Sequence, residues 1–187
     1  MVFGLLVIED YVGGALVGRI VKGRACDGDL STRNFHNFMT ALFYDSSLEF
    51  SVVDVSGYPR TFRIRYFDGD FSRGVIFWNR QYCDHAVRVR FGSGSTPPLR
   101  TDYRLASEFL VVTNPEVRFD AAGGFVYIEA GFTDVVARDV CEVGLTLVGT
   151  VYGSGTCGEV LLDRTVFSPC RSIPANTPYV VRYRLFF

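Results

Sequence analysis

The chain has 187 residues, a formal net charge of −1, and a composition that is 48% apolar and 15% aromatic. That length predicts one domain, residues 1–187, with a sizeable core, and the aromatic content excludes a disordered chain. A nucleic-acid-binding protein usually carries a basic excess, which is absent here, so no nucleic-acid partner is expected. Of the 19 lysine and arginine residues only Lys22 is a lysine. Arginine together with phenylalanine and tyrosine is typical of contacts between subunits.

The first 22 residues are apolar but do not read as a targeting segment. They lack a basic start, and Glu9, Asp10 and Arg19 interrupt the apolar run, so we expect neither a signal peptide nor a membrane-spanning helix. Their β-branched residues and glycines predict two strands around a turn near Val12 to Gly14. These strands are candidates for an arm that is exchanged between copies during assembly.

One segment, Leu30 to Tyr44, has helical spacing. Ser31 or Thr32 supplies an N-cap, and apolar residues then recur three and four positions apart. The pattern predicts a short amphipathic helix whose apolar face lies on a sheet.

Most of the remaining chain predicts short strands separated by turns. Residues 48–55 and 60–67 form a predicted hairpin, and further strands are expected at 74–78, 86–91, 109–112, 116–120, 125–132, 141–152, 159–167 and 179–187. Many strands and one helix indicate a mainly β protein, an antiparallel β-sandwich that is jelly-roll-like, with one short amphipathic helix.

An elaborate loop follows the strand at 86–91. A nucleotide-binding loop needs a lysine before Ser or Thr, or a third glycine, and this loop has neither. The Pro-Pro pair stiffens an extended segment, and Leu105 is expected to reach the core. We therefore predict a structural crossover between two sheets or halves, carried by Gly92, Gly94, Thr96, Pro97, Pro98, Asp102 and Leu105.

The five cysteines include no C-x-x-C pair, which excludes a zinc ribbon or a thioredoxin-type motif. In a chain without a signal peptide, buried free thiols are the ordinary interpretation. A Cys157–Cys170 disulfide is the alternative, because both residues flank one predicted strand.

Two acidic loops, one with Asp27 and Asp29 and one with Asp68 and Asp70, are weak calcium candidates. Ordinary turns stabilised by aspartate explain both loops equally well, since neither matches a complete calcium-binding loop. No other cofactor is expected.

No catalytic group of residues stands out. The two histidines, His36 and His85, are not part of a nucleophile motif, and neighbouring side chains in the Cys83 to His85 cluster point to opposite faces of a strand. The carboxylates Glu129 and Glu142 have no spacing that supports a hydrolase. We expect a protein that is not an enzyme.

The last predicted strand alternates regularly between two faces. One face carries Val181, Tyr183, Leu185 and Phe187, and the other carries Val180, Arg182, Arg184 and Phe186. We predict that the first set packs in the core and that the strand is an open edge that a neighbouring copy can pair. The expected interface residues are Arg182, Arg184, Phe186 and Phe187, with carboxylates such as Glu129 or Glu159 of the neighbour as partners.

Four segments together carry a resemblance to known proteins. They are the loop Gly92 to Leu105, C-E-V-G-L at 141–145, L-L-D-R-T-V-F-S-P at 161–169, and the segment from Ile173 to the end. In this order they resemble structural proteins of tailed phages and archaeal viruses, of the tail, tail-fibre or particle-surface type. The matching positions are Gly92, Gly94, Thr96, Pro97, Asp102, Leu105, Glu142, Gly144, Leu145, Leu161, Leu162, Arg164, Phe167, Pro169, Pro174 and Tyr183. Asn176 replaces the usual glycine, and asparagine tolerates the left-handed backbone of a turn.

The resemblance implies a non-enzymatic virion component that self-assembles into a homo-oligomer or filament in a tail, fibre or shell. Its expected location is the virion or an extracellular assembly, and its expected partners are other virion or fibre subunits and a host surface glycan. A second hypothesis is a carbohydrate- or cell-surface-binding β-sandwich module. In that case Trp78, Tyr82 and the Asp68 to Phe71 loop form the sugar platform.

Overall fold

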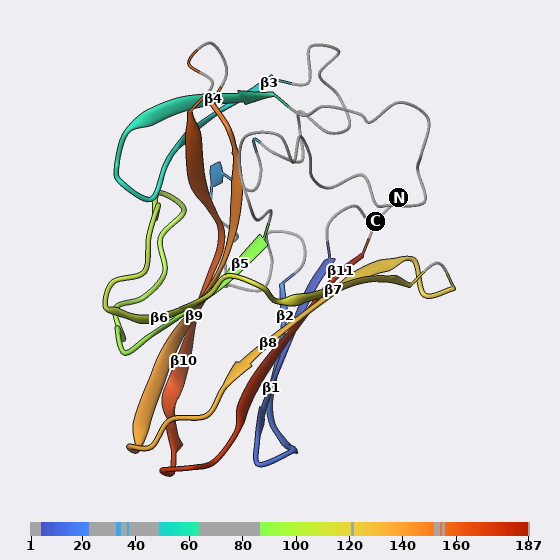
Figure 1. The fold of residues 1–187 in the computed structure, drawn as a ribbon, viewed down its shortest axis with the longest axis vertical. Helices are drawn as coiled ribbons and strands as arrows, with labels where there is room; N and C mark the ends of the chain where they lie inside the picture. The colour runs from blue at the N-terminus through green and yellow to red at the C-terminus, as the bar shows by residue number, and fades with distance from the viewer. Residues whose placement is uncertain are drawn as a thin grey trace.

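The computed structural model describes residues 5–22, 33–34, 37, 49–63, 87–120, 122–151, 154 and 156–186. Within these residues the protein is mainly β, with strands arranged in three antiparallel sheets (Figure 1). The prediction of a mainly β, antiparallel sandwich is confirmed. The expected helix at Leu30 to Tyr44 falls largely outside the described residues. Arg33, Asn34 and Asn37 have helical backbone, but no helical element is defined in the described part of the chain.

The first sheet has five strands in the order β2-β1-β11-β8-β7. Their bounds are β1 (Leu5–Val12), β2 (Ala15–Lys22), β7 (Glu116–Asp120), β8 (Phe125–Phe132) and β11 (Tyr179–Phe186). The predicted turn between the first two strands is present, with Gly13 and Gly14 at φ values of 56° and 85°. In this structure β1 pairs with β11 of the same chain, so the candidate arm lies within its own sheet.

The second sheet has four strands in the order β10-β9-β5-β6. Their bounds are β5 (Val87–Gly92), β6 (Glu108–Val112), β9 (Arg138–Thr150) and β10 (Cys157–Ile173). A separate hairpin of β3 (Glu49–Val53) and β4 (Pro59–Arg63) touches the end of this sheet through a bridge between Phe62 and Val151.

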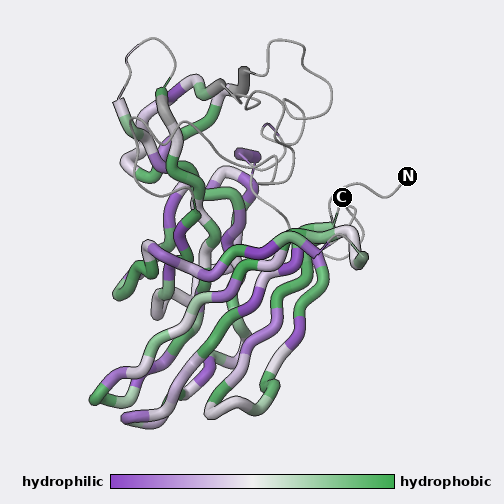
Figure 2. The backbone as a smooth tube through the Cα atoms, turned by 45° about the vertical axis from the view of Figure 1, so that its right-hand side comes forward, coloured by the Kyte–Doolittle hydropathy of each residue, from purple (hydrophilic) through white to green (hydrophobic). Residues whose placement is uncertain are grey.

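The core lies between the five-stranded and four-stranded sheets. Strand residues of period two face inward from both, for example Ile8 and Tyr183 from one sheet and Val89 and Leu145 from the other. Figure 2 shows the resulting alternation of apolar and polar residues along the strands. Aromatic rings contribute to this core, since Phe91 packs edge-on against Phe132 with ring centroids 5.1 Å apart.

The strand β11 is central, and the prediction of an open edge is wrong. It is hydrogen-bonded on one side to β1 and on the other to β8. Its inner face is buried as expected at Val181, Tyr183 and Leu185. Phe187, expected in the core and in the interface, lies outside the described residues. Alternation of apolar and polar residues indicates which face of a strand is buried and which is exposed to solvent. It does not indicate which strands pair with that strand, and the prediction of an open edge was wrong for this reason.

The loop between β5 and β6 is also not the crossover that the sequence suggested. These two strands pair directly in the four-stranded sheet, so residues 93–107 form a long hairpin loop. The chain steps between the sandwich sheets elsewhere, from β6 to β7, from β8 to β9 and from β10 to β11. Asn176, in the last of these steps, has a φ of 59°, which confirms that asparagine takes the left-handed conformation there.

Candidate functional site

The outer face of the five-stranded sheet carries arginines, carboxylates and aromatic rings that contact one another across strands. Arg182 of β11 donates to Glu129 of β8 at 2.6 Å, and its guanidinium lies 4.3 Å from the ring centroid of Tyr11 on β1. Glu9 accepts from Tyr11 at 3.1 Å and pairs with Arg184 at 3.0 Å. We call this surface the ladder face, made of Glu9, Tyr11, Arg19, Phe125, Tyr127, Glu129, Arg182, Arg184 and Phe186.

The charged side chains of the ladder face form ion pairs within the chain, and the pKa directions of Glu129 and Arg182 follow from their pair. Burial by itself raises the pKa of Glu129, but hydrogen bonds from Tyr127 and Arg182 outweigh burial and the net pKa is lowered. Burial and the bond to Glu129 raise the pKa of Tyr127 to about 12. The hydrogen bond to Glu129 raises the pKa of Arg182. At neutral pH a negatively charged Glu129 therefore lies beside a positively charged Arg182.

The carboxylates predicted as intermolecular partners of these arginines are bound to arginines of the same chain. Arg182 binds Glu129 of its own chain. Glu159 lies on the other sheet, where Arg88 and Arg90 bind it at 2.8 and 2.6 Å. Phe186 packs against Phe125 with ring centroids 5.1 Å apart. That the ladder face also contacts another copy stays a prediction.

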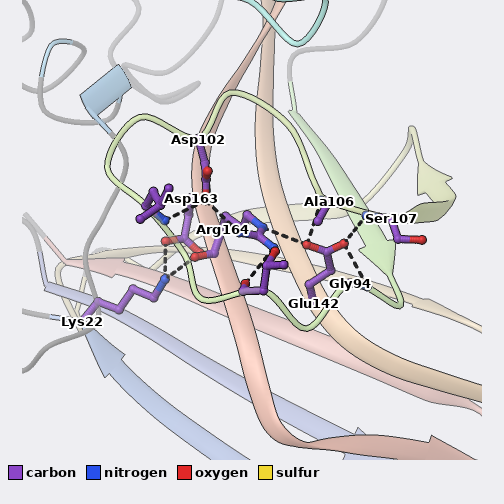
Figure 3. A network of polar contacts seen from close by, with 10 residues as sticks. Lys22, Gly94, Asp102, Ala106, Ser107, Glu142, Asp163 and Arg164 are labelled. Carbon is purple, nitrogen blue, oxygen red and sulfur yellow. Dashed lines mark hydrogen bonds and ion pairs between the residues drawn. The ribbon is translucent and has the colours of Figure 1, made fainter.

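The loop 93–107 folds over the outer face of the four-stranded sheet, where one buried carboxylate holds it (Figure 3). Oε1 of Glu142, on β9, accepts backbone N–H groups of Gly94 at 3.1 Å and Ser107 at 2.7 Å. Its Oε2 accepts the N–H of Ala106 at 3.1 Å and the Nε of Arg164 at 2.8 Å. The side chain of Glu142 is fully buried, so its four hydrogen bonds replace the water that it has lost.

Arg164 of β10 extends this network to the other side of the loop. Its guanidinium donates to Asp102 at 2.8 Å, and to the carbonyl and hydroxyl oxygens of Thr96 at 3.1 Å each. Burial by itself lowers the pKa of Arg164, but the bonds to Asp102 and Glu142 outweigh it and the net pKa is raised. We call Glu142, Arg164, Asp102 and Thr96 the loop clamp.

The glycines of the loop are required by the carboxylate of the clamp. A Cβ added at Gly92 or at Gly94 would lie 2.6 or 2.4 Å from Oε1 of Glu142, closer than real Cβ contacts. Leu105 is buried as predicted and lies against Gly144 of β9. Pro97 is exposed, so its contribution is to the stiffness of the segment.

Sequence reasoning found the residues of the clamp but not the clamp itself. The sequence places Gly94, Thr96 and Asp102 in the loop, whereas Glu142 stands out there only as a carboxylate without hydrolase spacing and, like Arg164, as a position of the resemblance. The available signal was chemical, because a glycine-rich loop has many N–H groups that need an acceptor. No buried side-chain nitrogen or oxygen atom of Glu142 or Arg164 lacks a hydrogen-bond partner among the described residues.

The cysteines differ from both interpretations of the sequence. Cys141 of β9 is bonded to Cys170 of β10, so the predicted Cys157–Cys170 disulfide is wrong. Cys157 takes part in a disulfide as well, so these three cysteines are not free thiols. Cys170 falls in a bulge of β10 between Val166 and Arg171, opposite Cys141, and sequence spacing does not reveal such a register.

Several predicted site residues lie outside the described residues. The calcium candidates Asp27, Asp29, Asp68 and Asp70 are among them, as is the sugar platform of Trp78, Tyr82 and the Asp68 to Phe71 loop. Within the described ranges no group of three or more histidine, cysteine, aspartate or glutamate side chains is arranged to hold a metal ion. Nor does the described part contain a helix of the length and hydropathy that a membrane span requires.

Known proteins include no match to this chain in the three comparisons that follow. No family model matches the chain, no curated protein matches it, and no solved structure matches its fold.

Proposed function

We propose that this protein is a non-enzymatic structural component of a virus particle, of the tail, fibre or shell type, that associates with copies of itself. The viral assignment rests on the resemblance of four sequence segments. Three of those segments supply the loop clamp, whose partners come from the loop, β9 and β10. The buried Glu142 and Arg164 at the centre of the clamp give the rigid scaffold that a particle subunit needs.

Exposed apolar side chains on the two outer strands of the five-stranded sheet carry the proposal of self-association. On β7, Val117 is 46% exposed and Phe119 is 60% exposed, and on β2 Leu16 is 54% exposed. In the described part of the chain β2 and β7 are the end strands of their sheet, so each presents one row of backbone groups outward. An open edge with apolar side chains favours pairing with a second strand.

The strand β7 is suited to pair with β7 of a second copy about a two-fold axis. In an antiparallel pair centred on Val117, Glu116 of each copy lies opposite Arg118 of the other. The same geometry brings the two Val117 side chains together. Charge complementarity and apolar contact thus favour one register, and the two five-stranded sheets become continuous.

Light scattering over a concentration series tests this proposal. The wild-type protein should form dimers or larger assemblies, and Val117→Asp with Phe119→Asp should shift the equilibrium to monomer. The matched control is Leu99→Asp, because Leu99 is also 60% exposed but lies on the loop, away from the sheet edge. Electron micrographs of the assembled protein should show closed rings, tubes or fibres. A wild-type protein that is monomeric at every concentration would overturn the proposal.

A further inference from the structure

The one lysine of this chain is buried between the two sheets. Lys22, at the end of β2, is 2% exposed. Its Nζ lies 2.7 Å from Oδ1 of Asp163 on β10 and 2.9 Å from the backbone oxygen of Arg164 (Figure 3). All other cationic side chains, apart from the two histidines, are arginines. The chain thus places a primary amine where water is excluded and a carboxyl group is adjacent.

The carboxyl group of Asp163 is held from its other side. Its side chain is fully buried, and the hydroxyl of Thr165 donates to Oδ2 at 2.9 Å. The hydroxyl of Tyr183, on β11, is buried in the same core and has no hydrogen-bond partner among the described residues. Burial together with the charge of Asp163 raises the pKa of Tyr183, so this hydroxyl keeps its proton.

An ion pair alone does not explain why a lysine stands here. A buried ion pair usually stabilises no more than apolar residues of the same size, and arginine forms the better-bonded pair with a carboxylate. The neighbouring contact between the sheets follows that preference, since Arg171 of β10 binds the buried Asp10 of β1 at 2.6 Å. What lysine offers and arginine does not is a nucleophilic amine once its proton is removed.

We propose that Lys22 and Asp163 condense to an intramolecular isopeptide bond between β2 and β10. Transfer of one proton from the ammonium group to the adjacent carboxylate gives a neutral amine and a neutral carboxylic acid, the two forms that can condense. The amine nitrogen attacks Cγ of Asp163, and the C–N bond forms as the C–OH bond breaks. One proton of the amine leaves with the hydroxyl as water, so the step needs no oxidant, reductant or activated donor.

The surrounding groups favour this step in named ways. The hydrogen bond from Thr165 polarises the carboxyl group and stabilises negative charge that develops on Oδ2 during the attack. The sheets fix the amine beside the carboxyl carbon, and such fixed pairs react with effective molarities of about 10⁵–10⁸ M. The released water leaves the core, which opposes hydrolysis of the amide.

Digestion of the reduced, denatured protein with a lysine-specific protease tests the bond directly. Lys22 is the one possible cleavage site, so a free lysine yields fragments 1–22 and 23–187. The isopeptide predicts a chain that stays intact, with a mass lower than the sequence mass by one water. A branched peptide joining Lys22 to Asp163 should appear after trypsin digestion.

Two variants complete the test without requiring a native fold. Asp163→Ala removes the acceptor and should restore both cleavage at Lys22 and the full sequence mass. Lys22→Arg keeps a cation at the site and should also have the full mass. Complete cleavage of the wild-type protein together with an unchanged mass overturns the proposal, as does a resistant Asp163→Ala chain.

Discussion

The variant Glu142→Gln tests the loop clamp with the smallest change in shape. Glutamine keeps one carbonyl oxygen but replaces the other acceptor with an NH₂ group. If the NH₂ group takes the place of Oε1, the N–H groups of Gly94 and Ser107 lose their acceptor. If it takes the place of Oε2, Ala106 and Arg164 lose theirs. In either orientation two donors, at least one of them only partly buried, face a third donor.

The magnitude follows from those two lost acceptors. A buried donor without an acceptor costs about 1–3 kcal/mol, so the free energy of unfolding should fall by about 2–6 kcal/mol. Domains of this kind are stable by about 5–15 kcal/mol, so the loss is a large share of the total. With a slope of about 2–3 kcal/mol per molar urea, the unfolding midpoint should fall by about 0.7–3 M.

Urea unfolding followed by circular dichroism measures this shift, and hydrogen exchange should show faster exchange at Gly94, Ala106 and Ser107. The control is Asp139→Asn, which removes one charge from an exposed side chain that accepts a hydrogen bond from Ser172 and should change stability by less than about 0.5 kcal/mol. A Glu142→Gln protein with the same midpoint and the same loop exchange as wild type would show that the carboxylate does not hold the loop.

Three further predictions concern other contacts. Replacing Cys141 and Cys170 by serine opens a link across a sequence separation of 29 and should lower the free energy of unfolding by about 3–4 kcal/mol; unchanged thermal stability would argue against the disulfide. Leu105→Ala should cost about 2–4 kcal/mol in chemical unfolding, and a cost near zero would remove this side chain from the core. The pKa of Glu129 is lower folded than unfolded, so its stabilisation is present at neutral pH and is lost as pH falls below 4.5 through the folded pKa. The variant Glu129→Gln should therefore lose less of its free energy of unfolding below pH 4.5 than the wild type does. The same loss in both proteins would show that Glu129 does not contribute this pH dependence.

The strands themselves were largely predictable from local pattern. The predicted strands at 116–120 and 125–132 coincide with β7 and β8, because alternation and flanking turns define such elements without outside help. The buried face of β11 followed from the same alternation. Strand neighbours did not follow, since the place of β11 between β1 and β8 depends on residues distant in sequence.

Only some residues of the loop clamp were predictable, because their contacts also join residues that are distant in the sequence. The composition of the loop favours a structural segment, but the Pro-Pro pair and Leu105 suggest a crossover where the structure has a hairpin. A hairpin loop of this length is stable here because Glu142 and Arg164, from two other strands, bind its backbone and side chains. The Cys141–Cys170 disulfide likewise depends on a bulge in β10, which no spacing of cysteines encodes.

The central position of β11 has a consequence for the order in which the molecule can be completed. Of the described strands β11 is synthesised last, yet it separates β1 from β8, both of which leave the ribosome much earlier. Until Tyr179 to Phe186 leave the ribosome, β1 and β8 each lack a neighbouring strand on one side. The hairpin of β1 and β2 therefore has no strand to pair with on the β1 side. Contacts between residues so far apart in the sequence form slowly. In the meantime the unpaired edges of β1 and β8 can pair with strands of other nascent chains. The sheet therefore cannot close before Tyr179 to Phe186 have left the ribosome.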